Sequence, residues 1–111
     1  TFFGWQDYAA VVRLAAVARV VVVPSVWEEP CATTILEALY LGRQVFALAR
    51  GGTPELAAYA TSPGQLLLYP DMPSLVAGVS KVSMTEPNPV AVDRGVTVDA
   101  RLHDLLQVYG A

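Results

Sequence analysis

Two glutamates stand at a spacing that could serve one ligand. Glu29 lies in a short polar loop over residues 25–30, and Glu37 follows after seven intervening residues. Carboxylate oxygens are strong hydrogen-bond acceptors, so two of them beside one crevice could border the same ligand. The alternative is that Glu37 is a solvated residue on an amphipathic helix, which is the usual place for a glutamate.

A strand and a helix are expected to position this pair. Residues 20–23 are four consecutive valines, and such a β-branched run predicts a strand buried on both faces of a parallel sheet. Pro24 ends the strand because it has no N–H to donate. A helix is predicted to begin near Cys31 and to end at Gly42, since glycine suits the position after a helix end.

The first turn of this helix would suit an anionic ligand. In an open α/β sheet, ligands bind beyond the carboxyl ends of the strands. A helix that starts there points free N–H groups and a partial positive charge toward the ligand, which favours phosphate. Thr33 and Thr34 add hydroxyls, and on a helical wheel Glu37 lies on their side. The opposite side is apolar and comprises Ile35, Leu36 and Leu39.

A pair of glycines marks a second loop in which backbone could approach a ligand. Gly51 and Gly52 follow a strand predicted over residues 44–48, and the absence of a Cβ permits close approach. Taken alone, a Gly-Gly pair is more often only a turn. Pro54 then suits the first position of a short helix.

The rest of the chain alternates between strands and helices. Further strands are predicted over residues 1–4 and 65–69, and a last amphipathic helix over about 97–109. Asp7 is the expected cap of the first helix, and Asp71 or Ser74 that of the helix after the last strand. This alternation predicts an α/β fold with a doubly wound parallel sheet and flanking helices.

Three aromatic side chains and the single histidine are not expected to be catalytic. Trp5, Tyr8 and Trp27 are interpreted as packing residues or pocket wall, and His103 as a surface or half-buried residue rather than a catalytic base.

The composition excludes several classes of protein. The chain has 111 residues, is 54% hydrophobic and carries a net charge of −3, which favours one ordered domain and argues against a nucleic-acid partner. No apolar run is long enough to span a membrane. One cysteine and one histidine exclude an internal disulfide and make a Cys/His metal site improbable. No signal peptide pattern is present, and we predict a cytoplasmic protein.

Several motifs resemble one family when they are taken in order. The central motif, residues 20–55, reads Pro-Ser-x-x-x-Glu-Pro from Pro24, Leu-Glu-Ala around Glu37, and Gly-Gly-x-Pro-Glu from Gly51. Phe-Phe-Gly-Trp at residues 2–5 resembles the strand that opens this part of the same domains. Together they resemble the C-terminal domain of retaining family-4 glycosyltransferases with the GT-B fold, over roughly residues 1–80.

The resemblance implies a Rossmann-like sheet of six strands in the order 3-2-1-4-5-6, of which this chain would hold the third to the sixth. We therefore interpret residues 1–111 as part of a donor-binding domain, with the N-terminal half of the parent enzyme as its missing partner. The strand at 20–23 should then be a sheet edge and should not pair with residues 2–3. The alternative is a small, complete domain with a divergent sheet.

The resemblance also assigns roles to residues. Glu29 would be the catalytic-site glutamate that binds hydroxyls of the donor sugar, and Glu37 would bind the ribose hydroxyls. Glu28 leaves the register open by one residue, but only Glu29 keeps the seven-residue gap and the following proline. The remaining donor-binding residues would be Ser25, Cys31, Ala32, Thr33, Thr34, Gly51 and Gly52.

Two positions depart from the family pattern. Ala32 stands where glycine is usual, and Arg50 precedes the glycine pair where a small or apolar residue is common.

The implied reaction is transfer of a sugar, with retention, from a nucleoside diphosphate sugar to an acceptor that the sequence does not identify. Such enzymes need no metal or cofactor, and the segment alone is expected to be inactive. Membrane association of the parent enzyme stays open. The alternatives are another GT-B enzyme, such as a nucleotide-sugar epimerase, and a non-catalytic binding or scaffolding module.

Overall fold

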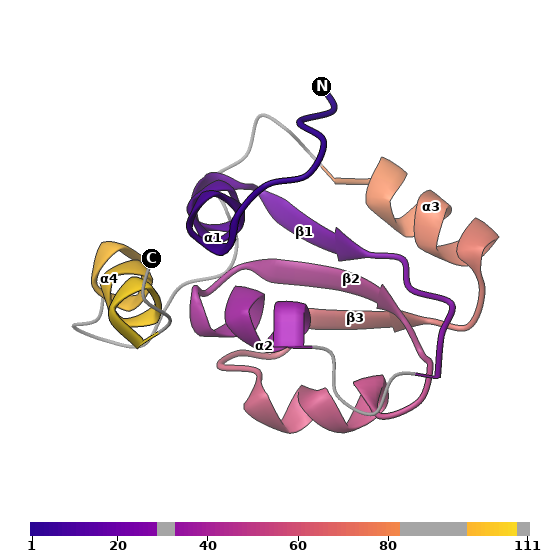
Figure 1. The fold of residues 1–111 in the computed structure, drawn as a ribbon. Coiled ribbons are helices and arrows are strands. Elements are labelled where there is room, and N and C mark those ends of the chain that lie inside the picture. Colours follow the sequence, from indigo (N-terminus) through magenta and orange to yellow (C-terminus); the bar gives the residue numbers. More distant parts are fainter. Residues whose placement is uncertain (29–32, 83–97, 109–111) are drawn as a thin grey trace.

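The computed structural model describes residues 1–28, 33–82 and 98–108. Within them, a parallel three-stranded sheet lies between two layers of helix (Figure 1). The strands are β1 (Val20–Val23), β2 (Gln44–Leu48) and β3 (Leu66–Tyr69), and they lie side by side in that order. The parallel α/β architecture predicted from the sequence is confirmed.

The central strand β2 shows why the sheet needs helices on both faces. Its alternate side chains point to opposite faces, and all four of Val45, Phe46, Ala47 and Leu48 are buried. Val45 and Ala47 pack with residues of α2 (Thr33–Tyr40) and the 3₁₀ helix η1 (Thr53–Tyr59). Phe46 and Leu48 pack against Leu75 of α3 (Met72–Ser80) on the other face.

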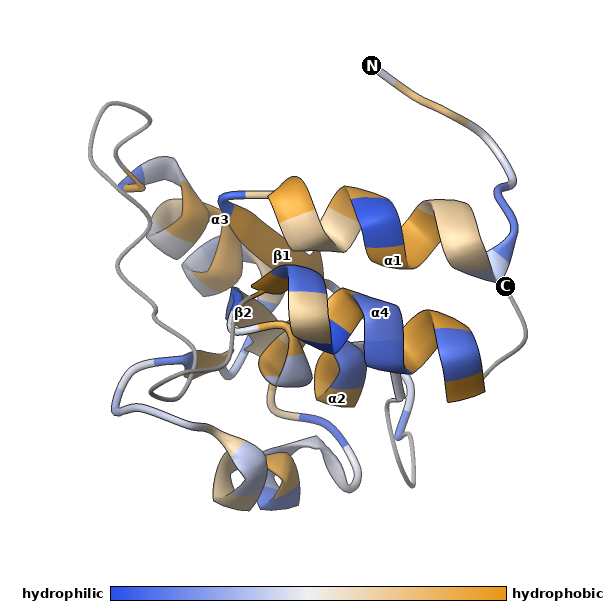
Figure 2. Ribbon diagram, turned by 90° about the vertical axis from the view of Figure 1, so that its left-hand side faces the viewer, coloured by the Kyte–Doolittle hydropathy of each residue, from blue (hydrophilic) through white to orange (hydrophobic). Residues whose placement is uncertain are grey.

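Two further helices complete the layer that contains α2. Val12 and Ala16 of α1 (Tyr8–Val17) form a small core with Leu105 of α4 (Val98–Val108) and with Leu41. Figure 2 shows α1 and α4 side by side. The predicted last helix over 97–109 is confirmed over its described residues.

Helix α4 is also held on α2 by polar contacts. The hydroxyl of Tyr40 donates to the Asp104 carboxylate at 2.9 Å, which raises the pKa of Tyr40. Arg101 donates to the Tyr40 carbonyl at 3.2 Å, and its guanidinium lies 4.7 Å from the centre of the Tyr40 ring. His103 on the same helix is exposed, as predicted.

The helix caps follow the sequence closely. The Asp7 carboxylate accepts from the Ala10 N–H at 2.9 Å at the start of α1, as expected. Of the two candidate caps for α3, Asp71 takes the role, because it accepts from the Ser74 N–H at 2.9 Å.

The strand predicted over residues 1–4 is wrong. This segment has no regular secondary structure, and Phe2 and Phe3 are exposed. A strand needs a neighbour that accepts and donates its backbone hydrogen bonds, and no described strand pairs with these residues. The adjacent aromatic residues Phe2 and Phe3 are typical of strands, but this composition alone did not predict the structure of the segment.

The expectation that residues 20–23 are buried on both faces is wrong as well. Strand β1 is half-buried, and Val22 keeps 40% of its surface exposed. The reason is that β1 is an outer strand, since its only described neighbour is β2. The edge position itself, and the lack of pairing with residues 2–3, are as predicted.

Candidate functional site

The carboxyl end of the sheet, where all three parallel strands end, carries most of the predicted site residues that the structure describes. Ser25 follows β1, the helix α2 begins with Thr33 and Thr34, and Gly51 and Gly52 follow β2. The predictions for Glu29, Cys31 and Ala32 lie outside the described residues.

Two predicted residues meet in one groove. Thr34 and Glu37 supply the polar side chains of a groove of about 250 Å³ between α1, β1 and α2. The rest of its lining is apolar, including Val20 and Val21 of the outer strand. The groove thus joins an apolar wall to one carboxylate and one hydroxyl, a combination typical of ligand sites.

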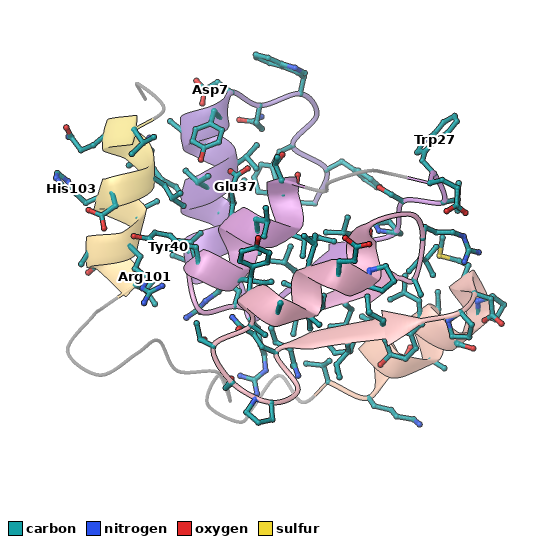
Figure 3. The ribbon with its side chains drawn as sticks, turned by 90° about the horizontal axis from the view of Figure 1, so that it is seen from below. Asp7, Trp27, Glu37, Tyr40, Arg101 and His103 are labelled. Atoms are coloured by element: carbon teal, nitrogen blue, oxygen red, sulfur yellow. The ribbon has the colours of Figure 1, made fainter. Side chains whose placement is uncertain are left out.

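Helix α2 presents Glu37 to this groove because its other side is fixed in the core. Ile35, Ala38 and Leu39 are buried, and Glu37 is half-buried on the side toward α1 (Figure 3). Leu36, which the helical wheel places on the apolar side, is only partly buried against this core. Glu37 is therefore not simply a solvated residue.

Glu37 also borders a second pocket of about 310 Å³, formed by α2, the end of η1 and α4. Its other polar residues are Tyr40, Tyr59, Thr61 and Arg101. Neither Thr33 nor Ser25 lines this pocket or the groove.

A contact that the sequence did not predict joins the loops after β1 and β2. The Glu28 carboxylate accepts a hydrogen bond from the Gly51 N–H at 2.6 Å. Such a bond to an ionised acceptor is among the stronger ones in proteins. The sequence gave one indication of this contact. Glu28 stands beside Glu29, so either glutamate could have been the one that matches the family motif.

The glycine loop owes its shape to Gly51 rather than to the pair. Gly51 has a φ of +51°, a conformation that residues with a Cβ adopt at a cost, whereas Gly52 has an ordinary φ of −80°. Arg50 holds the same loop from the other side, because it donates to the Pro70 carbonyl after β3 at 3.1 Å. This departure from the family pattern thus has a structural role.

The aromatic residues are less involved in packing than the sequence suggested. Trp5 and Trp27 are both largely exposed, so neither is a core residue. Tyr8 is half-buried and packs against the core between α1 and α4.

A further pocket of about 520 Å³ lies on the other face, between the sheet and α3. Arg19 and Lys81 are its basic residues, and none of the predicted site residues lines it. Lys81 and Val82 directly precede residues outside the description, so we assign no ligand to it.

The described residues contain neither a cluster of metal ligands nor a membrane-spanning helix. No three His, Cys, Asp or Glu side chains gather within residues 1–28, 33–82 and 98–108 to hold a metal ion. No helix in this part of the chain is both long enough and apolar enough to cross a membrane.

The parallel three-stranded sheet and its covering helices define a small α/β domain that is consistent with the Rossmann-like C-terminal domain of GT-B proteins. The family model for glycosyl transferases group 1 matches residues 1–90, so the chain belongs to that family. Helix α4 lies beyond the matched residues. No curated protein and no solved structure matches the chain.

Proposed function

We propose that this chain is the donor-binding region of a retaining glycosyltransferase, which transfers a sugar from a nucleoside diphosphate sugar to an acceptor. Membership of the glycosyl transferases group 1 family supports the transfer of sugars. The observation that carries the proposal is the position of Glu37, half-buried on α2 and bordering the groove beside β1.

The proposed roles follow the chemistry of the groove. The Glu37 carboxylate accepts hydrogen bonds from the two ribose hydroxyls, and the Thr34 hydroxyl lies on the same groove. The diphosphate binds near the first turn of α2, where backbone N–H groups favour anions. Glu29 acts on the donor sugar, and Ser25, Cys31, Ala32, Thr33, Gly51 and Gly52 complete the proposed donor site.

The proposed transfer needs no nucleophilic side chain, metal or cofactor from this chain. The protein supplies orientation of the sugar and stabilisation of the charge on the departing diphosphate. Both effects depend on groups that are held in place before the substrate arrives.

We propose further that β1 pairs in the parent enzyme with the first strand of the same six-stranded sheet, which lies outside residues 1–111. The outer side of β1 has no neighbour among the described strands, and apolar grooves lie on both faces beside it. An unpaired apolar edge of this kind invites another strand. In isolation, residues 1–111 are therefore expected to self-associate and to lack transferase activity.

The role of Glu37 can be tested by calorimetry with UDP, GDP and ADP as probes. Glu37→Ala should weaken binding of the preferred diphosphate by roughly 1–3 kcal/mol, because one hydrogen-bonded charged group is lost. Asp99→Ala, an exposed change on α4, is the matched control and should leave affinity unchanged.

Unchanged affinity in a folded Glu37→Ala variant would contradict the assigned role. Absence of binding to all three nucleotides by the unmodified full-length protein would contradict the proposed function and would favour a scaffolding module.

A further inference from the structure

Helix α4 holds the last residue of α2, Tyr40, at three points. The Tyr40 hydroxyl donates to the Asp104 carboxylate at 2.9 Å, and the Tyr40 carbonyl accepts from Arg101 at 3.2 Å. The Arg101 guanidinium also lies 4.7 Å from the centre of the Tyr40 ring, within the range of a cation–π contact. We call Tyr40, Arg101 and Asp104 the Tyr40 clamp.

The Tyr40 clamp acts at the end of α2 where a helix needs outside partners. The last carbonyls of a helix have no donor within it, so Arg101 satisfies one of them and places positive charge at the negative end of the helix dipole. Arg101 does so from a buried position, with 9% of its surface exposed. Because α2 has only eight residues, its order depends on tertiary contacts of this kind.

The Tyr40 clamp lies one turn from the proposed ribose-binding carboxylate. Glu37 stands three residues before Tyr40, and residues at this spacing are neighbours on a helix surface. Glu37, Tyr40 and Arg101 line the same pocket of about 310 Å³. The apolar side of α2 packs against the sheet without a directional preference, whereas hydrogen bonds are directional. The clamp therefore opposes rotation of α2 about its axis, a motion that would carry Glu37 with it.

We propose that Arg101 and Asp104 are positioning residues for the nucleotide of the donor, because they hold Tyr40 and thereby set where the Glu37 carboxylate lies. The inference rests on the proposed function, since the position of Glu37 matters only if this residue binds the ribose. Neither positioning residue lines the groove beside β1, so both act through α2. A binding group has to be held within about 0.5 Å of its productive place, which gives such support a measurable effect.

Binding of UDP, GDP and ADP to the full-length parent protein, followed by calorimetry, tests this role. Tyr40→Phe removes the hydroxyl and keeps the ring, and Asp104→Ala removes the acceptor. Each should weaken binding of the preferred diphosphate by about two- to tenfold, in the range expected of residues that act on a site without touching its ligand. Asp104→Asn should retain most of the affinity, because its amide oxygen can still accept from Tyr40.

His103→Ala is the matched control. His103 is exposed on α4 beside Asp104, and Figure 3 shows it pointing away from α2, so this change should leave the affinity as it is. The thermal midpoint of each variant is measured as well, and calorimetry is performed well below it. A contact that only stabilises the fold would lower the midpoint and leave the affinity of the folded protein unchanged.

A double-mutant cycle tests whether the Tyr40 clamp acts through Glu37. In a Glu37→Ala background, Tyr40→Phe should cause no further loss of affinity, because the group that the clamp positions is gone. A loss that persists in full would overturn the proposed route through Glu37.

The outcomes separate this inference from the proposed function. If a nucleoside diphosphate binds with the same affinity to the parent protein, Tyr40→Phe and Asp104→Ala, the positioning role is overturned and the proposed function stands. If the parent protein binds none of the three nucleotides, both are overturned.

Discussion

Gln65 and Arg43 at the amino end of the sheet are buried and bonded within the protein, whereas Glu28 and Arg50 at the carboxyl end make exposed hydrogen bonds between loops. At the amino end, Gln65 is 0% exposed and Arg43 is 8% exposed. The Gln65 amide donates to the carbonyls of Leu39 and Arg43 at 3.0 and 3.2 Å and accepts from the Thr61 N–H at 2.6 Å. These bonds join α2 to the residue directly before β2 and to the turn after η1.

Burial of the Arg43 guanidinium at this end of the sheet disfavours its charged form. Arg43 donates to the carbonyls of Leu41 and Ala18, both at 3.3 Å, and burial lowers its pKa because the charged form loses contact with water. A buried cation is tolerated here because backbone carbonyls surround it.

At the carboxyl end, Glu28 and Arg50 make their bonds at the surface. There, the Gly51 N–H and the Pro70 carbonyl are each bonded to a side chain from another loop, and both bonds are exposed. From this difference we expect the buried bonds of Gln65 and Arg43 to contribute more to stability than the exposed bonds of Glu28 and Arg50. Function on loops that a rigid scaffold holds is the usual arrangement in α/β domains.

Gln65→Ala should produce the largest loss of stability among the changes considered. It would remove the buried hydrogen bonds to the Leu39 and Arg43 carbonyls, at a cost of about 2–3 kcal/mol. Urea denaturation followed by circular dichroism measures the free energy of unfolding.

Gln44→Ala is the matched control for this change. Gln44 begins the neighbouring strand and makes one exposed bond to the Gly64 carbonyl at 3.2 Å. Its replacement should cost less than about 1 kcal/mol. Equal losses for the two glutamines would remove the contrast between buried and exposed bonding.

Arg50→Ala should have a smaller effect on stability, about 1 kcal/mol or less, because its bonds to the Ala49 and Pro70 carbonyls are exposed. Its main consequence should be faster hydrogen exchange of the Gly51 amide, since the glycine loop loses the side-chain bond that ties it to Pro70. Arg13→Ala, an exposed change on α1, should alter neither measurement. A loss as large as that of Gln65→Ala would show that the carboxyl end is also structural.

The smallest effect concerns Asp71, which caps α3 just after β3. Hydrogen bonds from Ser74, its side chain first and its backbone second, lower the pKa of Asp71 from the ordinary value of 3.8. A carboxyl with a lowered folded-state pKa stabilises the protein above its unfolded pKa, and this stabilisation is lost as the pH falls through the folded value.

Asp71→Asn should therefore lower the thermal midpoint slightly at pH 7. The difference from the parent should shrink below pH 3.8, because asparagine caps a helix without titrating. A difference that is constant across this range would mean that the charge of Asp71 does not matter to the cap.

The sequence predicted the regular elements well where local patterns carried the information. The valine strand, the helix around Glu37 and the cap at Asp7 depend on residues close together in the chain. The strand predicted at residues 1–4 failed because pairing depends on a neighbour that no local pattern reveals. The predicted burial of β1 failed for the same reason, since an outer strand and a central strand can have the same sequence.

The sequence alone therefore determined the order of elements, the parallel α/β class and the side of α2 on which Glu37 lies, because periodicity and capping are local properties. Only the tertiary structure decided that Glu28 meets Gly51 and that Gln65 is buried among three elements. Those contacts join residues 23 and 26 positions apart, for which no spacing rule exists. They arise from the way parallel strands bring the ends of separate loops together at one end of a sheet.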